Sequence, residues 1–448
     1  MRFSAAEVAA AVAGELHGAD VDLDGVAIDS RRVQGGELFV PVVAERDGHD
    51  FVDAARAAGA AAHLSARPGS AAGAGDEPTP VIRVADTGAA LLGLGGHART
   101  RLPDRVVGIT GSAGKTSTKD LLRSVLMQRW RTTANEASFN NELGVPLTLA
   151  NAPPGTEAAV VEMGARGAGH IARLCTVARP TVGVVTLVAD AHLATFGSVD
   201  DVARAKAELV EALGSTGFAV LNADDHRVAA MAGCTTATVV GFGEAAGDVR
   251  AEEVTLDAEL RPSFRLLSPW GETAVQLAVH GRHQVVNALA AATAALALGC
   301  TVDDVAAGLV AATPSAMRMD LRLAPSGAVV IDDAYNANPT SVRAALDALA
   351  AVDADRRLAV LGAMAELGPD GPRLHREVAA HAERLGIRVI SVAAPDYGVG
   401  HDDRAADVDA VPALLGPLRE GDAVLVKGSR VAALEGVVAA LLSRPTPG

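Results

Sequence analysis

A glycine-rich turn between an apolar strand and a helix has the residue types that bind phosphate groups. It occupies residues 106–117 and reads VVGITGSAGKTS. Glycines allow backbone N–H groups to turn toward an anion, and the N-terminus of the following helix adds partial positive charge. Lys115 can neutralise phosphate oxygens, and the Thr116 hydroxyl can complete the ligand shell of Mg²⁺. We therefore predict a phosphate-binding loop rather than a turn that only joins a strand to a helix.

The spacing of this loop narrows the class of nucleotide-binding protein. The common phosphate-binding loop has a glycine six residues before its lysine, where this chain has Ile109. The shorter loop indicates a particular group of ATP-using proteins rather than GTPases or motor ATPases in general. The loop residues predicted to bind ATP are Gly111, Ser112, Ala113, Gly114, Lys115, Thr116 and Ser117.

Two further side chains lie where predicted strands end. Glu162 closes a strand over 158–163, and His192 follows a strand over 181–188. The carboxyl ends of parallel strands meet at one edge of a sheet, so both side chains are expected near the phosphate-binding loop. For Glu162 we favour Mg²⁺ binding over a carboxylate in solvent, whereas His192 taken alone is more often a loop histidine without a function. Together the two become candidate metal ligands.

Lys206 falls within the apolar stripe of a predicted helix over 199–210. The other apolar positions of this stripe are 199, 202, 209 and 213. An ammonium group on the inward face loses its hydration, so its pKa should fall and a neutral amine becomes available for chemistry. The alternative is a lysine whose aliphatic part follows the apolar face while its amine reaches water. The sequence alone leaves these two interpretations open.

Polar residues also follow two later strands. The segment 331–339 reads IDDAYNANP, and carboxylates and amides directly after a buried strand require partners. We interpret it as a ligand contact at a domain junction. The last predicted strand runs into Lys427, Gly428, Ser429 and Arg430. These residues indicate a bound anion, or a basic turn that balances local acidic side chains.

The elements that must hold these residues predict an α/β protein of three domains, because 448 residues exceed the size of a single core. Residues 1–86 alternate short helices with strands over 26–28, 38–40 and 81–84. Residues 87–313 repeat strand and helix, with strands over 105–110, 158–163 and 181–188, which indicates a central, doubly wound, ATP-binding P-loop domain. Residues 314–448 restart the alternation as a C-terminal Rossmann-like α/β domain with parallel strands over 328–331, 357–361, 389–392 and 423–426. Three lobes with the ATP loop in the middle one indicate closure around substrates.

Composition excludes several classes of protein. A net charge of −15 argues against a nucleic-acid or anionic-membrane surface. No apolar stretch approaches the roughly 18 residues of a spanning helix, and the three cysteines lack metal-ligand spacing, so we expect a soluble, cytoplasmic protein. The chain has only four lysines among its 39 basic side chains. Each is a candidate for a specific role, except that Lys119 is interpreted as a solvated helix residue.

These motifs resemble those of the Mur ligase family, the ATP-dependent enzymes that form amide bonds of the peptidoglycan stem peptide. The resemblance covers nearly the whole chain. Besides the short ATP loop, the resemblance includes the family's substrate-facing loop, which is matched here by Asn140 and Asn141 followed by Gly144 and Pro146. The segments 29–31, 36–40 and 47–51 look like the family's uridine-nucleotide-binding pattern. The third-domain motifs YNANP (335–339), AELG (365–368) and KGSR (427–430) resemble the branch that attaches D-alanyl-D-alanine. One departure is Gln284, where the family usually has asparagine.

The resemblance implies a role for each domain. The N-terminal α/β lobe is expected to bind the UDP-linked substrate, the central domain ATP, and the C-terminal domain the incoming dipeptide while it closes on ATP. The implied substrates are UDP-MurNAc-tripeptide and D-Ala-D-Ala, joined through an acyl phosphate, with no nucleic-acid partner, no membrane insertion and a monomeric state. Two alternatives stay open: a Mur-type ligase acting on another amino acid, and a regulatory ATP-binding protein that uses closure as a switch.

The resemblance also implies roles for single residues. Lys115 and the loop amides are expected to hold the ATP phosphates, while Thr116 and Glu162 bind a first Mg²⁺. His192 and Lys206 are expected to bind a second Mg²⁺, with Lys206 carbamylated. The expected catalytic residues are thus Lys115, Glu162, His192 and Lys206. Asn287, Arg318 and Asp333 are expected to contact adenine, phosphate and ribose. The expected substrate-binding residues are Ser30, Arg31, Gly48, His49, Asn140, Asn141, Asn336 and Asn338.

Overall fold

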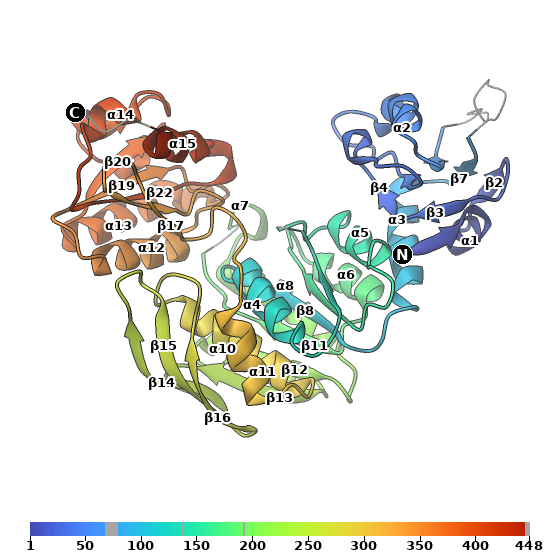
Figure 1. Ribbon diagram of the computed structural model, residues 1–448, viewed down its shortest axis with the longest axis horizontal. Helices are drawn as coiled ribbons and strands as arrows, with labels where there is room; N and C mark the ends of the chain where they lie inside the picture. The colour runs from blue at the N-terminus through green and yellow to red at the C-terminus, as the bar shows by residue number, and fades with distance from the viewer. Residues whose placement is uncertain (68–78, 137, 191–192, 444–448) are drawn as a thin grey trace.

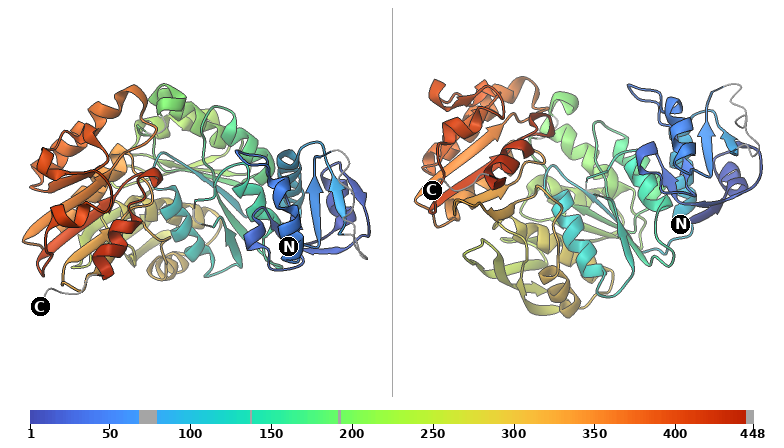
Figure 2. Two further views of the ribbon diagram at one scale, coloured as in Figure 1. Left: turned by 90° about the horizontal axis from the view of Figure 1, so that it is seen from above. Right: turned by 45° about the horizontal axis from the view of Figure 1, so that its top comes forward.

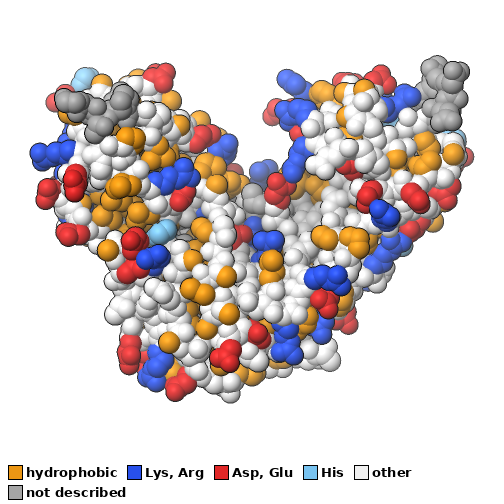
Figure 3. All heavy atoms as spheres, viewed as in Figure 1, with side chains coloured by type: hydrophobic (Ala, Val, Ile, Leu, Met, Phe, Trp, Pro, Cys, Tyr) orange, Lys and Arg blue, Asp and Glu red, His pale blue; other side chains and the backbone are white. Residues whose placement is uncertain are grey.

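The computed structural model shows three lobes, each built around its own β-sheet (Figure 1). The structure describes residues 1–67, 79–136, 138–190 and 193–443. The N-terminal and C-terminal lobes lie at opposite ends of the central one, so the two chain termini are far apart (Figure 2). Figure 3 shows that the molecule is hollowed between the two outer lobes, with the central lobe as the floor of the hollow. The α/β architecture in three parts is therefore confirmed, while the exact domain boundaries stay a prediction.

The N-terminal lobe contains a five-stranded sheet of order β2-β7-β6-β5-β4. Its members are β2 (Glu15–His17), β7 (Val81–Arg83), β6 (Ala62–Ser65), β5 (Leu38–Phe39) and β4 (Val26–Ala27). The strands β4 to β7 are parallel, and β2 is antiparallel to β7. A separate pair joins β1 (Arg2–Ser4) to β3 (Asp22–Asp24). The helices α1 (Ala5–Ala11) and α2 (Val52–Ala57) complete this lobe, and its three predicted strands are confirmed as β4, β5 and β7.

The central lobe contains a nine-stranded sheet of order β16-β15-β14-β13-β12-β11-β8-β10-β9. Its parallel strands are β8 (Val106–Thr110), β9 (Thr132–Ala134), β10 (Ala158–Glu162), β11 (Val182–Val185), β12 (Phe218–Asn222), β13 (Thr238–Gly243) and β14 (Val249–Leu256). The predicted strands over 105–110, 158–163 and 181–188 are confirmed as β8, β10 and β11. The prediction that strand and helix alternate up to residue 313 was wrong. After β14, the strands β15 (Pro262–Ser268) and β16 (Gly271–Gln276) extend the sheet, with β15 antiparallel to β14 and β16 antiparallel to β15.

Helices cover both faces of the central sheet. Side chains of β8 contribute to the apolar cores on both faces of the sheet, because successive side chains of a strand point to opposite faces. Val107 and Ile109 belong to the first core, and Val106 belongs to the second core. The first core includes α4 (Lys115–Leu126), α10 (Gln284–Ala297) and α11 (Val302–Val310), and the second includes α3 (Thr87–Arg99), α5 (Gly144–Ala150) and α6 (His170–Ala178). The helix α8 (Val199–Glu211) packs against α6 and β11. The loop that joins β8 to α4 therefore lies at the carboxyl edge of a fully covered sheet.

The C-terminal lobe contains a six-stranded sheet of order β17-β18-β22-β19-β20-β21. The four predicted parallel strands are confirmed as β18 (Val329–Asp332), β22 (Asp422–Lys427), β19 (Arg356–Gly362) and β20 (Arg388–Val392). The two edge strands were not predicted: β17 (Asp320–Leu323) runs antiparallel to β18, and β21 (Arg404–Ala405) runs parallel to β20. One face is covered by α12 (Pro339–Ala351) and α13 (Gly371–Arg384), the other by α14 (Val411–Leu415) and α15 (Glu435–Ser443).

The two outer lobes join the central one differently. The N-terminal lobe shares an apolar core with it, which takes in Phe3 and Leu38 together with Val145 and Val161. Asn151 adds a polar contact, because its side-chain amide accepts from the Val26 N–H at 2.7 Å and donates to the Val26 carbonyl at 2.9 Å. The C-terminal lobe contacts the central lobe through polar groups near the ATP loop, such as Asn338 and Ser112, and through Leu260, which joins the apolar core of the C-terminal lobe.

Within the described ranges, no helix is long and apolar enough to cross a membrane.

Two neighbouring glycines of α3 allow a matched test of the packing between α3 and α5. A methyl group at Gly95 would lie 2.4 Å from Cβ and 2.5 Å from Cα of Pro146, whereas one at Gly96 would meet no atom within 4 Å. We expect Gly95→Ala to lower the free energy of unfolding by about 1–3 kcal/mol because of overpacking. Gly96→Ala should raise it by about 0.5–1 kcal/mol, since alanine favours helices. Urea unfolding of both variants measures these changes; equal effects at the two positions would contradict the packing.

Candidate active site

The ATP loop predicted from the sequence lies between β8 and α4. Gly111 has φ of +151°, and a Cβ atom there would lie 1.8 Å from the Thr186 hydroxyl. Thr186 in turn donates to the Ala113 carbonyl at 2.6 Å. The Lys115 ammonium donates to the Gly111 carbonyl at 2.7 Å and so folds back over the loop. Burial lowers the pKa of Lys115, opposed by the nearby Glu162 carboxylate and reinforced by Arg318.

The first turn of α4 leaves its backbone amides available to an anion. Its N-cap is Gly114, which has φ of +81° and no side chain with which to cap the helix. Unsatisfied amides at a helix N-terminus bind phosphate groups well. The loop geometry therefore agrees with the phosphate-binding role predicted for it.

Glu162 and Thr116 meet beside this helix start. Glu162, 1% exposed at the end of β10, accepts a hydrogen bond from the Thr116 hydroxyl at 2.9 Å. Its other carboxylate oxygen accepts from the Asn140 amide at 2.6 Å. The Glu162 N–H donates to the Asn135 side chain at 2.6 Å, so both ends of this residue are held. Thr116 and Glu162, which were expected to bind one Mg²⁺ together, are thus adjacent to each other and to Asn140, which was expected to face the substrate.

Thr116 and Glu162 suit Mg²⁺ on their donor chemistry. A hydroxyl and a carboxylate are the hard oxygen ligands that Mg²⁺ prefers, and it usually takes its remaining ligands from substrate phosphates and water. Within the described ranges, no group of three or more His, Cys, Asp or Glu side chains could hold a metal ion by itself. The arrangement therefore fits an ion shared with a phosphate ligand rather than a site made by the protein alone.

The C-terminal lobe contributes Arg318 to the same place. One guanidinium nitrogen of Arg318 lies 3.3 Å from the Thr116 hydroxyl, and its guanidinium carbon lies 4.3 Å from the centre of the Tyr335 ring. The Tyr335 hydroxyl contacts the Ser138 hydroxyl of the central lobe. The phosphate contact expected of Arg318 is consistent with this position. Tyr335 is a residue whose part in the site was not predicted, although its motif was noted.

Asn287 of α10 lies against the ATP loop. A Cβ atom at Gly114 would lie 2.3 Å from the Asn287 side-chain oxygen, so only glycine leaves room for this amide. The Asn287 amide group donates to Gln284 at 2.9 Å. The longer Gln284 side chain, the departure from the family pattern, therefore acts on Asn287 directly. His283 precedes them, and burial lowers its pKa.

Asp333 and Lys427 form a buried ion pair at the adjoining edge of the C-terminal sheet. Their charged atoms lie 2.5 Å apart, and the Lys427 ammonium also donates to the Asn336 carbonyl at 2.9 Å. The other Asp333 oxygen accepts from the Met319 N–H at 3.2 Å. Lys427 thus holds the carboxylate that was expected to contact the ribose. Lys427 therefore balances a local carboxylate, as in the second interpretation of this strand end, although both groups are buried. A bound anion at this strand end stays a prediction.

Lys206 is buried, which decides between the two interpretations left open by the sequence. Its side chain on α8 is 3% exposed, and among the described residues no hydrogen-bond partner of its ammonium is present. Desolvation lowers the pKa of Lys206 to about 7, with a smaller contribution from the positive charge of Lys115. A neutral amine is therefore accessible near neutral pH. His192, its expected companion as a metal ligand, lies outside the described residues.

The residues expected to bind the uridine nucleotide lie in the N-terminal lobe, away from the ATP loop. Ser30 and Arg31 are in a short 3-10 helix, where Arg31 binds Asp29 through its backbone and its guanidinium and holds the pKa of that carboxyl at about 2. Gly48 permits a close turn, since a Cβ atom there would lie 2.5 Å from the Val42 nitrogen. A substrate contact at these positions stays a prediction.

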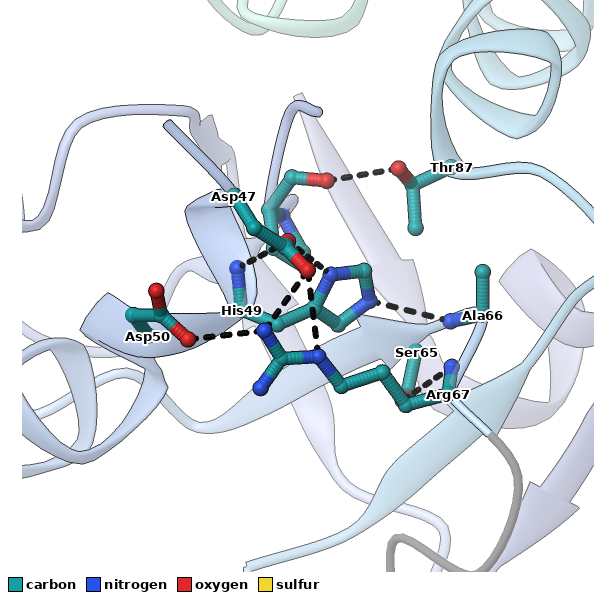
Figure 4. A network of polar contacts seen from close by, with 8 residues as sticks. Asp47, His49, Asp50, Ser65, Ala66, Arg67 and Thr87 are labelled. Carbon is teal, nitrogen blue, oxygen red and sulfur yellow. Dashed lines mark hydrogen bonds and ion pairs between the residues drawn. The ribbon is translucent and has the colours of Figure 1, made fainter. Parts of the chain in front are cut away.

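His49 lies at the centre of a polar network in this lobe (Figure 4). Its Nδ1 lies 2.6 Å from an Asp47 oxygen, and its Nε2 accepts from the Ala66 N–H at 3.1 Å. Arg67 binds the second Asp47 oxygen at 2.6 Å and Asp50 at 2.7 Å. The backbone N–H of His49 also donates to Asp47, at 3.0 Å. This backbone bond is the largest cause of the lowered pKa of Asp47, followed by the bonds from the His49 ring and from Arg67. Because both ring nitrogens of His49 are engaged within the protein, its ring shapes this loop.

Three asparagines expected to face substrates also have partners within the protein. Asn141 caps the start of α5 by accepting from the Gly144 N–H at 3.0 Å. Asn336 accepts from the Ala337 N–H at 2.9 Å through its side chain. Asn338 caps α12 and donates to the Ser112 carbonyl of the ATP loop at 3.3 Å, so it links the two lobes. Their contacts with substrates stay predictions.

The interpretation of Lys119 as a solvated residue was wrong. Lys119 is 2% exposed, and its ammonium donates to the Asn135 carbonyl at 3.0 Å beside Asp120 at 3.2 Å. Since Asn135 also binds the Glu162 N–H, Lys119 supports the loop that holds the candidate metal ligand. Its position within the apolar stripe of α4 was the signal in the sequence.

Comparison with known proteins agrees with this geometry. The Mur ligase family catalytic domain matches residues 22–92, the Mur ligase middle domain residues 109–295, and the Mur ligase glutamate ligase domain residues 317–430. The chain belongs to the Mur ligase family of ATP-dependent ligases.

One relative is a protein of Mycobacterium tuberculosis (strain ATCC 25618 / H37Rv) named UDP-N-acetylmuramoyl-tripeptide–D-alanyl-D-alanine ligase. It is 42% identical to this chain over an alignment that covers 94% of this chain and 93% of the relative. The crystal structure of MurF from Acinetobacter baumannii superposes with a TM-score of 0.89 at 30% identity and 99% coverage of both chains. MurF ligase from Thermotoga maritima in complex with ADP is also similar, with a TM-score of 0.78, 27% identity and coverage of 93% of this chain and 96% of that one.

The lowered pKa of Lys206 predicts how stability varies with pH. The unfolded chain binds this proton up to about pH 10.5, whereas the folded chain releases it near pH 7. Its contribution to stability is therefore full above the unfolded pKa and decreases as pH falls toward the folded one. We expect the free energy of unfolding in CO2-free buffer without nucleotide to rise from about pH 7 to about pH 9, by at most about 1.4 kcal/mol per pH unit from this group.

The variant Lys206→Met isolates this effect, since methionine fills the same space without a titrating group. Urea unfolding at several pH values should give a smaller rise for Lys206→Met than for the unmodified protein, and a higher stability of the variant near neutral pH. Identical pH slopes for the two proteins would show that the Lys206 amine is hydrated in the folded state.

Proposed function

We propose that this chain is the ligase that joins D-alanyl-D-alanine to UDP-N-acetylmuramoyl-tripeptide, with conversion of ATP to ADP and phosphate. The observation that carries the proposal is the name of the 42% identical relative together with its coverage of 94% of this chain. The third-domain residues support it, since Tyr335, Asn336 and Lys427 of the two C-terminal motifs gather around the candidate ATP site. The product belongs to the synthesis of peptidoglycan precursors.

ATP would lie with its phosphates over the loop 111–117 and the start of α4. Lys115, the loop amides and Arg318 would offset the negative charge that collects when a carboxylate approaches a triphosphate. Thr116 and Glu162 would hold one Mg²⁺, and Lys206, as a carbamate, would hold a second with His192. Bound there, Mg²⁺ supplies Lewis-acid polarisation of phosphate oxygens. Asn287, Arg318 and Asp333 would bind the adenine, phosphate and ribose groups.

The chemistry follows from the poor reactivity of a carboxylate toward an amine. The terminal carboxylate of the tripeptide attacks the γ-phosphorus of ATP, an acyl phosphate forms and ADP leaves. The amine of D-Ala-D-Ala then attacks the acyl carbon, an amide bond forms, and phosphate leaves while the amine loses its proton. Lys115 and Arg318 stay close to the transferred phosphate group in both steps.

Closure of the C-terminal lobe would protect the acyl phosphate from water. The contacts of Tyr335 with Ser138 and of Asn338 with Ser112 already bridge the two lobes at the edge of the ATP loop. Exclusion of water strengthens electrostatic interactions and prevents hydrolysis of the intermediate. We further propose that the protein acts as a monomer in the cytoplasm. The free state of its three cysteines is consistent with a reducing compartment.

Phosphate release tests the proposed reaction. We expect release from ATP only when both UDP-MurNAc-tripeptide and D-Ala-D-Ala are present, with one amide bond formed per phosphate. The isosteric variant Glu162→Gln should lower kcat at least about 100-fold, the scale of losing one transition-state electrostatic contact. Equal ATP turnover without the dipeptide would favour a regulatory ATP-binding protein, and turnover with free amino acids in its place would favour another Mur-type ligase.

The carbamate on Lys206 has its own test. Protein equilibrated with ¹³C-bicarbonate should give a carbamate signal in its NMR spectrum, and Lys206→Arg should lack that signal because its guanidinium cannot be carbamylated. We expect Lys206→Ala to be inactive and to recover part of its activity with formate or acetate, which can occupy the vacated ligand position. A fully active Lys206→Ala, or a signal that persists in Lys206→Arg, is incompatible with the carbamate.

A further inference from the structure

The segment that connects the central and C-terminal lobes is anchored to the helix of the ATP loop. Ser315 lies in this connection, between α11 and β17. Its N–H and its hydroxyl both donate to one carboxylate oxygen of Asp120, at 2.9 and 2.7 Å. Asp120 is on α4, four residues after Thr116 and therefore about one helical turn away. A single side chain thus links the ATP loop helix to the start of the connection.

The connection then reaches the candidate phosphate site within three residues. Arg318 approaches the Thr116 hydroxyl at 3.3 Å and lies between two residues of unusual backbone conformation. Met317 has φ of +59° and Met319 has φ of +54°, in the left-handed region that residues with a side chain rarely adopt. Such conformations are maintained only where the surroundings hold them.

The surroundings hold this segment at both ends. On the far side, the Met317 carbonyl accepts from the Tyr335 N–H at 3.4 Å, and the Met319 N–H donates to Asp333 at 3.2 Å. Both of these contacts belong to the C-terminal lobe. On the near side, Ser315 is tied to α4 of the central lobe by its contact with Asp120. Without this contact, the segment would lose its anchor to the ATP loop helix, and the position of Arg318 relative to Thr116 would be less well fixed.

We propose that Asp120 is a positioning residue for ATP, which acts through Ser315 to hold Arg318 against the phosphate-binding loop. This inference rests on the proposed function only in that Arg318 contacts the phosphates of the nucleotide. Asp120 itself faces the connection and not the ligand. Its effect is therefore on the affinity for nucleotide, and much less on that for the other two substrates.

A purely structural role for Asp120 is the alternative, because Asp120 also lies 3.2 Å from the ammonium of the buried Lys119. Loss of the carboxylate would disturb that neighbour as well. The variant Ser315→Ala separates the two roles. It removes the hydroxyl that binds Asp120 and leaves both Asp120 and Lys119 in place.

The experiment measures the dissociation constant for ADP by calorimetry and the three KM values of the ligase reaction. We expect Asp120→Ala to weaken ADP binding about tenfold, which is about 1.4 kcal/mol, and Ser315→Ala to weaken it by a smaller factor. KM for ATP should rise in parallel, while KM for D-Ala-D-Ala and for the UDP substrate stays within twofold. Asp303→Ala removes an exposed carboxylate from the adjacent helix α11 and should change none of these values.

A double-mutant cycle with Arg318→Ala shows whether Asp120 acts through that residue. In the Arg318→Ala protein, the additional change Asp120→Ala should have no further effect on ADP affinity, because the group that it positions is gone. Additive losses, or unchanged ADP affinity in both Asp120→Ala and Ser315→Ala, would overturn the proposal. Binding of ADP requires no acceptor substrate, so these outcomes are distinct from a failure of the proposed ligase reaction.

Discussion

Positive charges gathered around one buried carboxylate are the constraint on which the site depends. Lys115 and Arg318 approach the region that Glu162 and Thr116 define, and Lys206 is close enough for Lys115 to lower its pKa further. Burial lowers the pKa of both lysines, which means that their charged forms are costly without an anion nearby. In the proposed function, a triphosphate with its divalent cation would supply that anion. Affinity for the nucleotide therefore depends on how the four segments that carry these residues are arranged, namely α4, β10, α8 and the connection between α11 and β17.

Most of this arrangement could be predicted because parallel strands place their carboxyl ends at one edge. The loop after β8 and Glu162 at the end of β10 are adjacent for that reason, and Lys206 is buried because helical spacing places it in an apolar stripe. The same reasoning applied to Lys119 would have shown its burial, since Thr116, Leu122 and Leu126 on its face of α4 are buried too. That error came from treating the helix of a binding loop as exposed, not from a missing signal.

Other features depend on contacts that no local pattern contains. Asp120 and Ser315 are 195 residues apart in sequence, and neither position is unusual for its helix or loop. The antiparallel extension by β15 and β16 follows a run of parallel strands whose alternation with helices gave no reason to expect it. His49 illustrates a different limit: its motif predicted a contact with the uridine nucleotide, but only the structure shows that Asp47 and the Ala66 N–H occupy both of its ring nitrogens.

The way each outer lobe is joined to the central one explains which of them can move during a reaction. The N-terminal lobe shares a continuous apolar core with the central lobe, and separating them would expose that surface to water. Among the described residues, the apolar core of the C-terminal lobe takes in one side chain from the central sheet's loops, Leu260, and the other contacts near the ATP loop are polar. Polar contacts can be exchanged for contacts with water or substrate at small net cost. The C-terminal lobe is therefore the one that can open and close relative to the ATP loop. In the proposed function, the N-terminal lobe would hold the UDP-linked substrate at a fixed position relative to that loop.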